Sequence, residues 1–202
     1  MGLPQRTRAL TPAEYLEIER LALYRSEYFD GEMFAMAGGS PRHSLIKANL
    51  VSELRNRLKG KTCTAYDSDL RIRIAASGVY TYADASVICG EIELDDQDPD
   101  TVLNPTLIAE VLSGGTEAYD RGKKFDHYRK LPSLKEYLLV SQDGPKIERF
   151  SKNEDGTWML TIVSGLDQVL DLSSIGVTVS LAEIFDKVDF TSEPGNSANS
   201  SV

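Results

Sequence analysis

The sequence contains little cysteine. Only Cys63 and Cys89 occur among 202 residues, far apart and each within a stretch of strand-like composition. Two cysteines without close spacing exclude the usual zinc motifs and a disulfide framework. We therefore interpret both as small, half-buried core residues of a protein in a reducing cytoplasm.

Long hydrophobic runs are also missing. No apolar stretch approaches the roughly 20 residues that span a bilayer. Residues 1–8 lack the apolar core of a secretory signal. These absences predict that the protein has no membrane partner and that it resides in the cytoplasm.

Positive charge is in deficit. The chain has 22 Lys and Arg residues against 31 Asp and Glu residues, a net charge of −9, so its surface as a whole does not attract nucleic acid. The basic residues nevertheless gather in residues 42–61 and 121–130. These two segments fit either a basic cleft on an acidic body or ordinary solvated faces.

The length of 202 residues suits one domain with a full hydrophobic core. We predict a flexible segment over residues 1–10, a single domain over residues 11–190, and a disordered tail over residues 191–202. The tail is rich in Ser, Asn and Gly, which cannot bury enough apolar surface to offset the entropy of ordering.

Turn and capping residues in the first part of the chain predict two helices around a hairpin. A Thr-Pro pair at residues 11–12 begins a helix that runs to about residue 22. An Asp-Gly pair turns a hairpin over residues 28–36. A Ser-Pro pair at residues 40–41 begins a second helix, which ends at Gly60.

Strand-like alternation begins after the second helix. The predicted elements are strands over residues 70–74 and 79–89, an acidic loop over 91–100, a strand over 107–112, a helix over 117–131, a strand over 137–140, a meander over 147–150, 157–163 and 169–172, and a short helix over 181–185. The central order of helix, three strands, helix and strand predicts an α+β fold. We expect a mixed sheet flanked by helices, with an N-terminal helix and hairpin and a C-terminal β-meander.

Glu110 is unusual because it lies inside an otherwise apolar run, residues 107–112. Such a run is typical of a strand buried on both faces. An unpaired carboxylate there would either cost several kcal/mol or shift its pKa until it is neutral. A buried ion pair, a proton-transfer group or a metal ligand would each explain its presence.

Asp84 similarly interrupts a β-rich run, in which it would share a strand face with Tyr82 and Ser86. Glu110 would share its own strand face with Ile108 and Leu112. Two carboxylates on one side of neighbouring strands would form an oxygen site for a hard cation such as Mg²⁺ or Mn²⁺. Without a cation they would repel, and one would stay protonated.

Three further residues could complete such a site. Lys124 lies on the predicted helix after Glu110, one turn before Tyr128. It could position a water and stabilise the negative charge that develops during attack on a phosphodiester. Glu32 follows a turn glycine and could supply another carboxylate. His43 lies in the first turn of its helix, near the positive end of the helix dipole.

Each candidate also has an ordinary structural interpretation. Asp84 could cap a turn, and Glu110 could form a buried ion pair with Lys124 or an arginine. Lys124 and His43 could be solvated helix residues, and Glu32 could be a plain hairpin residue. The joint order of the candidates along the chain favours a shared site.

The order of Asp84, Glu110 in a strand and Lys124 in the next helix resembles a migrated-lysine form of the PD-(D/E)xK nuclease motif. More narrowly, the chain resembles the Uma two family of restriction-endonuclease-like proteins, which is abundant in cyanobacteria. The matching segments are residues 30–32, 40–43, 69–74, 80–91, 108–113, 118–128 and 136–137, spread over nearly all of residues 11–187.

The resemblance implies a restriction-endonuclease-like core and an endonuclease that hydrolyses DNA with Mg²⁺ or Mn²⁺. On this interpretation Asp84 and Glu110 hold the metal, and Lys124 takes the place of the motif's lysine. Glu32 and His43 match family positions that line the same site. Nucleases of this type often act as dimers to cut both strands, so a homodimer is compatible with the resemblance, although the sequence leaves the oligomeric state open.

Two segments depart from the family pattern. Ala83 stands where a proline usually precedes the metal-binding aspartate, and residues 113–116 have the sequence Ser-Gly-Gly-Thr instead of Ser-Pro-Ser-Thr. Neither change removes a reactive group, but both leave the backbone more conformational freedom. Together with the net charge of −9, they leave open an alternative function, a non-catalytic nuclease-fold module for binding or assembly.

Overall fold

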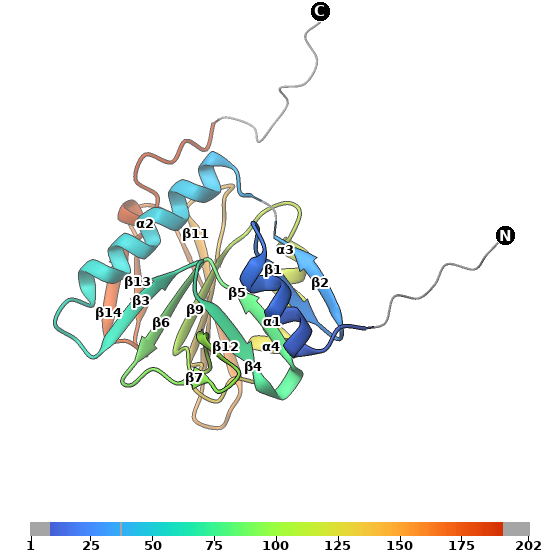
Figure 1. Cartoon of the computed structure of the whole chain (residues 1–202). Helices are drawn as coiled ribbons and strands as arrows, with labels where there is room; N and C mark the ends of the chain where they lie inside the picture. Colours follow the sequence, from blue (N-terminus) through green and yellow to red (C-terminus); the bar gives the residue numbers. More distant parts are fainter. Residues whose placement is uncertain (1–8, 37, 192–202) are drawn as a thin grey trace, which may run out of the picture.

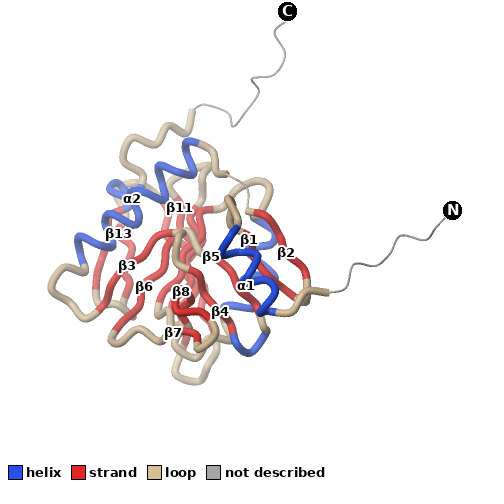
Figure 2. Tube along the Cα trace, in the orientation of Figure 1, coloured by secondary structure: helices blue, strands red, loops and turns tan. Residues whose placement is uncertain are grey.

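The computed structural model of the chain describes residues 9–36 and 38–191 (Figure 1). Helices and strands mix in an α+β fold with two six-stranded sheets and one two-stranded sheet (Figure 2). This architecture confirms the predicted fold class. The predicted flexible segment 1–10 and tail 191–202 lie outside the described residues, except for residues 9, 10 and 191, and the domain limits 11–190 stay a prediction.

One six-stranded sheet, here called the main sheet, carries the predicted core. Its strand order is β12-β11-β10-β9-β6-β3. Only β9 and β10 run parallel, and the helical segment between them provides the crossover that a parallel pair requires. The bounds are β3 Cys63–Asp67, β6 Ala85–Cys89, β9 Leu107–Val111, β10 Glu136–Val140, β11 Lys146–Lys152 and β12 Trp158–Ser164.

The second six-stranded sheet, here called the N-terminal sheet, has the order β2-β1-β5-β4-β8-β7. It contains the predicted Asp-Gly hairpin, in which Phe29 pairs with Glu32. A separate antiparallel pair, β13 with β14, follows the main sheet in sequence. The bounds are β1 Ser26–Phe29, β2 Glu32–Ala35, β4 Arg71–Ile74, β5 Val79–Tyr82, β7 Leu94–Asp95, β8 Asp98–Val102, β13 Val169–Leu172 and β14 Val177–Ser180.

The helices begin where the sequence predicts them. In α1 (Pro12–Leu21) the Thr11 side chain accepts from Glu14 N, and the Glu14 side chain accepts from Thr11 N, a complete capping box. In α2 (Pro41–Arg57) Ser40 is the N-cap. The remaining helical segments are η1 Ala75–Ser77, α3 Glu117–Tyr119, the π-helical turn η2 Asp120–Lys124, α4 Phe125–Tyr128 and α5 Leu181–Ile184. None of the helices in the described residues is long and apolar enough to cross a bilayer.

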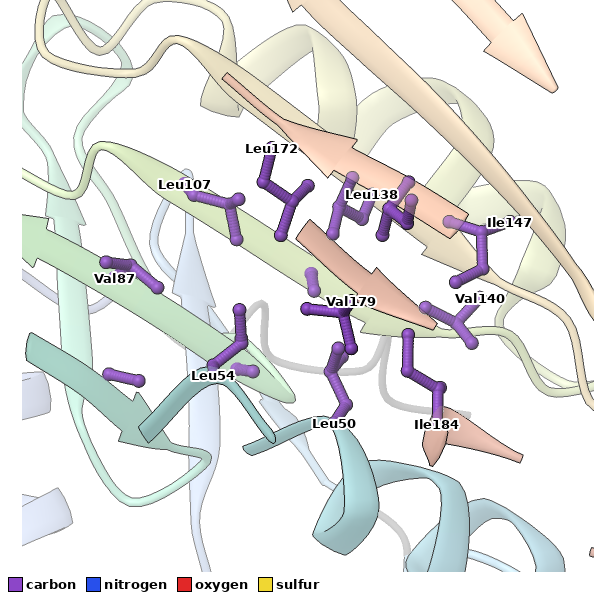
Figure 3. Close-up of a cluster of buried hydrophobic side chains, with 14 of the residues drawn as sticks. Leu50, Leu54, Val87, Leu107, Leu138, Val140, Ile147, Leu172, Val179 and Ile184 are labelled. Atoms are coloured by element: carbon purple, nitrogen blue, oxygen red, sulfur yellow. The ribbon is translucent and has the colours of Figure 1, made fainter. Parts of the chain in front are cut away.

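The main sheet separates two apolar clusters. On one face α2 packs against the sheet. Figure 3 shows Leu54 of α2 near Val87 and Leu107 of the strands, and Leu50 next to Val179 of β14. On the other face Ile108 and Leu112 pack with Tyr128 and Tyr137. Successive residues of β9 therefore point to alternate faces, which places Glu110 on the side of α4.

Three predicted elements differ from the structure. The single strand expected over residues 79–89 is divided into β5 and β6, which belong to different sheets. The acidic segment expected as a loop over residues 91–100 contains β7 and the start of β8, because Asp95 and Asp98 are neutralised by Arg73 and Arg71. The pairing of β13 with β14 was not predicted, so the C-terminal meander consists of β10, β11 and β12 only.

The interpretation of the cysteines as two separate thiols is wrong. Cys63 and Cys89 lie opposite each other in the register of β3 and β6, with Cα atoms 3.9 Å apart, and their sulfurs form a disulfide. Their sequence separation of 26 conceals this proximity, which arises only when the two strands pair.

Candidate active site

Glu110 is buried in the centre of the main sheet, with 4% of its surface exposed. Its position in β9 follows from the apolar sequence around it, because both faces of this strand are covered. The Tyr128 hydroxyl of α4 donates a hydrogen bond to Glu110 Oε1 over 2.9 Å. Glu110 is thus a buried carboxyl group that receives a hydrogen bond from the helix packed on its face.

Asp84 lies at the break between β5 and β6, where the chain passes from the N-terminal sheet to the main sheet. The prediction that Asp84 shares a strand face with Tyr82 and Ser86 is therefore wrong, because no strand continues through residues 83 and 84. Its Oδ2 accepts a hydrogen bond from Val111 N over 2.8 Å. This bond fixes Asp84 beside the residue that follows Glu110, so the break itself brings the two carboxylates together.

Lys124 places a buried ammonium group between the two sheets. Its Nζ lies 2.9 Å from Glu110 Oε1 and 3.7 Å from Asp120 Oδ1, and it donates to the Tyr82 carbonyl oxygen over 3.3 Å. The spacing of four residues from Asp120 to Lys124 is typical of a helical ion pair. The structure therefore brings the predicted lysine to the predicted glutamate.

Glu27 is a member of this cluster that the sequence interpretation missed. Its Oε1 lies 3.2 Å from Lys124 Nζ and accepts from the Thr81 hydroxyl over 2.6 Å. In β1 it alternates with Tyr28, which packs against α1, so Glu27 points to the opposite side of the strand. That alternation was present in the sequence, as was the helical spacing that links Asp120 to Lys124.

His43 and Lys47 approach Asp84 from the first turns of α2. His43 Nε2 lies 3.1 Å from Asp84 Oδ1, and Lys47 Nζ lies 3.9 Å from the same oxygen. The Ser40 cap, which accepts from His43 N, determines where the helix begins and hence where the imidazole lies. His43 is brought to the site as predicted, and Lys47 one turn later could have been inferred from its helical spacing.

Glu32 is the predicted site residue that the structure leaves outside the cluster. It is exposed on β2, an edge strand, opposite Phe29. Among the described residues no hydrogen bond or ion pair joins it to Asp84, Glu110 or Lys124. The hairpin does supply a carboxylate to the site, but from its other strand.

The charges of the cluster do not balance. Four carboxylates, Glu27, Asp84, Glu110 and Asp120, are held by Lys124 and, on the side of Asp84, by Lys47 and His43. Burial raises the pKa of Glu110 to about 8; Lys124 opposes the shift, whereas the charges of Asp84 and Asp120 add to it. Burial therefore makes Glu110 a weaker acid than an ordinary glutamate.

The pKa values of the other groups of the site shift in directions that their nearest partners determine. Burial would raise the pKa of Asp84, but the hydrogen bond and charge of His43 and the Val111 N–H outweigh it and lower that pKa. Burial would lower the pKa of Lys124, yet the charges of Glu110, Glu27 and Asp120 hold it well above its usual range. The lysine accordingly keeps its charge beside Glu110.

The donor chemistry of Asp84 and Glu110 fits Mg²⁺ or Mn²⁺. Within residues 9–36 and 38–191, no three His, Cys, Asp or Glu side chains converge as a ready-made metal site. Mg²⁺ does not require one, because it is usually held by one or two carboxylates and retains several waters. The surplus of carboxylates around Lys124 favours the entry of a cation.

Comparison with known proteins identifies the family of the chain. The family model Uma2, described as "Putative restriction endonuclease", matches residues 12–182. The chain belongs to the Uma2 family. Two Synechocystis proteins, the uncharacterized proteins slr1290 and sll1609, are 40% and 38% identical to it over 90% and 83% of the chain and 94% of each relative.

A solved structure shows the same fold. The crystal structure of a putative nuclease belonging to DUF820 from Anabaena variabilis superposes with a TM-score of 0.69 and covers 85% of this chain and 95% of its own. Its identity to this Uma2 chain is 19%, so the likeness concerns the fold. It confirms the predicted restriction-endonuclease-like architecture.

The two departures from the usual Uma2 pattern lie directly beside the site. Ala83 is buried within the apolar cluster on the Glu110 side of the main sheet. In the segment 113–116, the Ser113 and Thr116 hydroxyls lie 2.9 Å apart, and Thr116 donates to Asp120 Oδ2 over 2.7 Å. In this Uma2 chain the loop therefore makes polar contacts with η2 although glycines occupy its centre.

Proposed function

We propose that this protein is a metal-dependent endonuclease that hydrolyses phosphodiester bonds of DNA. One observation carries the proposal: Asp84, Glu110 and Lys124, far apart in a Uma2 family chain, meet at the end of β9 in a buried cluster with surplus negative charge. Mg²⁺ or Mn²⁺ held by Asp84 and Glu110 would neutralise phosphate charge and activate a water.

The residues around the cation have distinct tasks in this proposal. Lys124 stabilises the negative charge that develops on the phosphate, because its ammonium is already desolvated and held in place before the reaction. Glu27 and Asp120 keep that ammonium charged and oriented. His43 orients Asp84 through its Nε2, and Tyr128 orients Glu110 through its hydroxyl.

A plasmid-nicking assay tests the proposal. The purified protein should nick supercoiled DNA with Mg²⁺ or Mn²⁺ and lose this activity in EDTA. Asp84→Ala and Glu110→Ala should each abolish nicking, whereas Glu17→Ala, an exposed carboxylate on α1, should retain it. Equal nicking by the parent and both site variants would identify a contaminating nuclease and contradict the proposal.

A non-catalytic module for binding or assembly is the second candidate, and one observation favours it. Each carboxylate of the site already has a protein partner, such as Lys124 for Glu110 or His43 for Asp84, so the cluster can exist without a metal. This candidate requires that titration calorimetry detect no Mg²⁺ or Mn²⁺ binding. Binding that disappears in Glu110→Gln would contradict it.

The proposal also includes a substrate, an oligomeric state and a cellular location. DNA is the proposed substrate, a homodimer is the proposed assembly, and the cytoplasm is the proposed location. The Cys63–Cys89 disulfide bears on the last point, because structural disulfides are rare in a reducing cytosol. Protein purified in the presence of an alkylating agent should then be reduced and its thiols titrated: two thiols that appear only on reduction would show that the bond exists in cells, and none would show that both cysteines were free.

A further inference from the structure

The strand β12 forms one edge of the main sheet. All seven of its residues pair with β11, from Trp158 opposite Lys152 to Ser164 opposite Lys146. No strand among the described residues pairs with the other side of β12. The backbone groups on that side can therefore accept another extended strand.

Three apolar side chains of β12 are also exposed. Met159, Leu160 and Ile162 have 50%, 47% and 59% of their surfaces exposed. Leu166 and Val169, which follow the strand, are exposed to 49% and 56%. Exposed apolar side chains gathered along one sheet edge are typical of an interaction surface.

None of the usual protections of an edge strand is present in β12. Its sequence, Trp-Met-Leu-Thr-Ile-Val-Ser, has no charged residue and no proline, and its register with β11 has no bulge. The outermost strands at the other sheet edges are shorter: five residues in β3, four each in β2, β13 and β14, and two in β7. Among the described strands β12 is the edge best suited to pairing.

We propose that β12 pairs in antiparallel orientation with β12 of a second copy, around a twofold axis at Thr161. The occupant of this edge must be an extended strand, because only a strand presents backbone donors and acceptors at the matching spacing. The two main sheets then continue as one sheet across the axis.

The residues of β12 favour a second copy of the same strand as its partner, because they are complementary to themselves about Thr161. Around Thr161 the sequence is symmetric in character, so Leu160 meets the partner's Ile162 and Met159 meets the partner's Val163. The two central threonines face each other, a favourable cross-strand pair. Any twofold interface must be self-complementary in this way.

The net charge of each copy affects how strongly two copies associate, but it does not determine that they associate through β12. Each copy carries a net charge of −9, which opposes the approach of two copies at low ionic strength. The seven residues of β12 bring no like charges together. The dimer is therefore expected to strengthen as salt is added, and this differs from an interface held by ion pairs.

The oligomeric state of the full chain tests the proposal. Light scattering after size exclusion should give a dimer for the parent and a monomer for Ile162→Lys. Leu23→Lys, at a fully exposed leucine after α1, should remain a dimer. Leu160→Glu is a second variant, and circular dichroism must show that both β12 variants are folded. A monomeric parent at every soluble concentration, or a dimeric folded Ile162→Lys, would overturn the proposal.

The position of the axis has its own test. Opposed residues on antiparallel strands have Cβ atoms about 4.5–5.5 Å apart, so Thr161→Cys should form a covalent dimer on oxidation. Thr178→Cys, at an exposed threonine on β14, should not. A parent dimer in which Thr161→Cys fails to crosslink would overturn the Thr161 axis. Because these measurements do not involve DNA, their outcome is independent of nuclease activity.

Discussion

Lys124 is shared among carboxylates from three different elements, and each of them contributes in a different way. Glu110 comes from β9, Asp120 from η2 and Glu27 from β1. Glu110 is also a proposed metal ligand, whereas Glu27 and Asp120 contact only the lysine side of the cluster. Substitutions at Glu27 should therefore separate the role of the lysine from that of the metal.

We predict that Glu27→Gln slows plasmid nicking by roughly 10- to 100-fold, as is typical when an outer partner of a reactive group is removed. The amide keeps the shape and can still accept from Thr81, but it no longer neutralises Lys124. Calorimetry should show unchanged Mg²⁺ affinity. Glu32→Gln is the matched comparison. A full loss of nicking in Glu32→Gln with no loss in Glu27→Gln would instead support the prediction from sequence that Glu32 lines the site.

Metal binding should depend on pH because of Glu110. Its pKa is raised to about 8 by burial, so below that pH a cation must displace a proton before it can bind. The affinity for Mg²⁺ should fall as the pH decreases below 8, approaching tenfold per unit, and level off above it. Calorimetry between pH 6 and 9 in buffers of different ionisation enthalpy would measure the released proton, and an affinity independent of pH would contradict the prediction.

The elements around the site differ in how far the sequence determines them. The helix caps at Thr11 and Ser40 and the apolar run of β9 are local patterns, and all three elements form where predicted. The break at Asp84 has no local sequence signal, because residues 79–89 have the composition of one continuous strand. The break arises because the first part of this segment pairs in the N-terminal sheet and the second part in the main sheet. Glu27 was missed for the same reason, since its partner Lys124 is 97 residues away in sequence (124 − 27).

The loop after β9 allows a direct test of its glycines. Gly115 does not have a positive φ, and a Cβ there would meet no atom within 4 Å. We predict that Gly115→Ala stabilises the protein by about 0.4–1 kcal/mol, because alanine restricts the unfolded chain. Gly78→Ala is the matched control: space is equally open there, but its φ of +66° disfavours alanine. Chemical denaturation measures both, and destabilisation by Gly115→Ala would contradict the prediction.

At the scale of the whole molecule, the disulfide ties the edge strand β3 to β6, the strand that begins directly after Asp84. We predict that reduction lowers the free energy of unfolding by about 2–4 kcal/mol, the usual effect of opening such a loop. Thermal melts with and without reductant measure it. The double variant Cys63→Ser/Cys89→Ser should melt like the reduced parent and show no response to reductant. Two free thiols in the oxidised parent would contradict the bond itself.

The two large sheets of the molecule meet at the proposed site, and this has a consequence for its biosynthesis. Glu27 belongs to the N-terminal sheet, Glu110 to the main sheet, and Lys124 reaches both. A growing chain makes the first of these residues early and the last only after more than half of its length. A nascent chain shorter than 124 residues therefore lacks the complete set of side chains, and the cluster can form only after the strands of both sheets and the helical segment that follows β9 have been made.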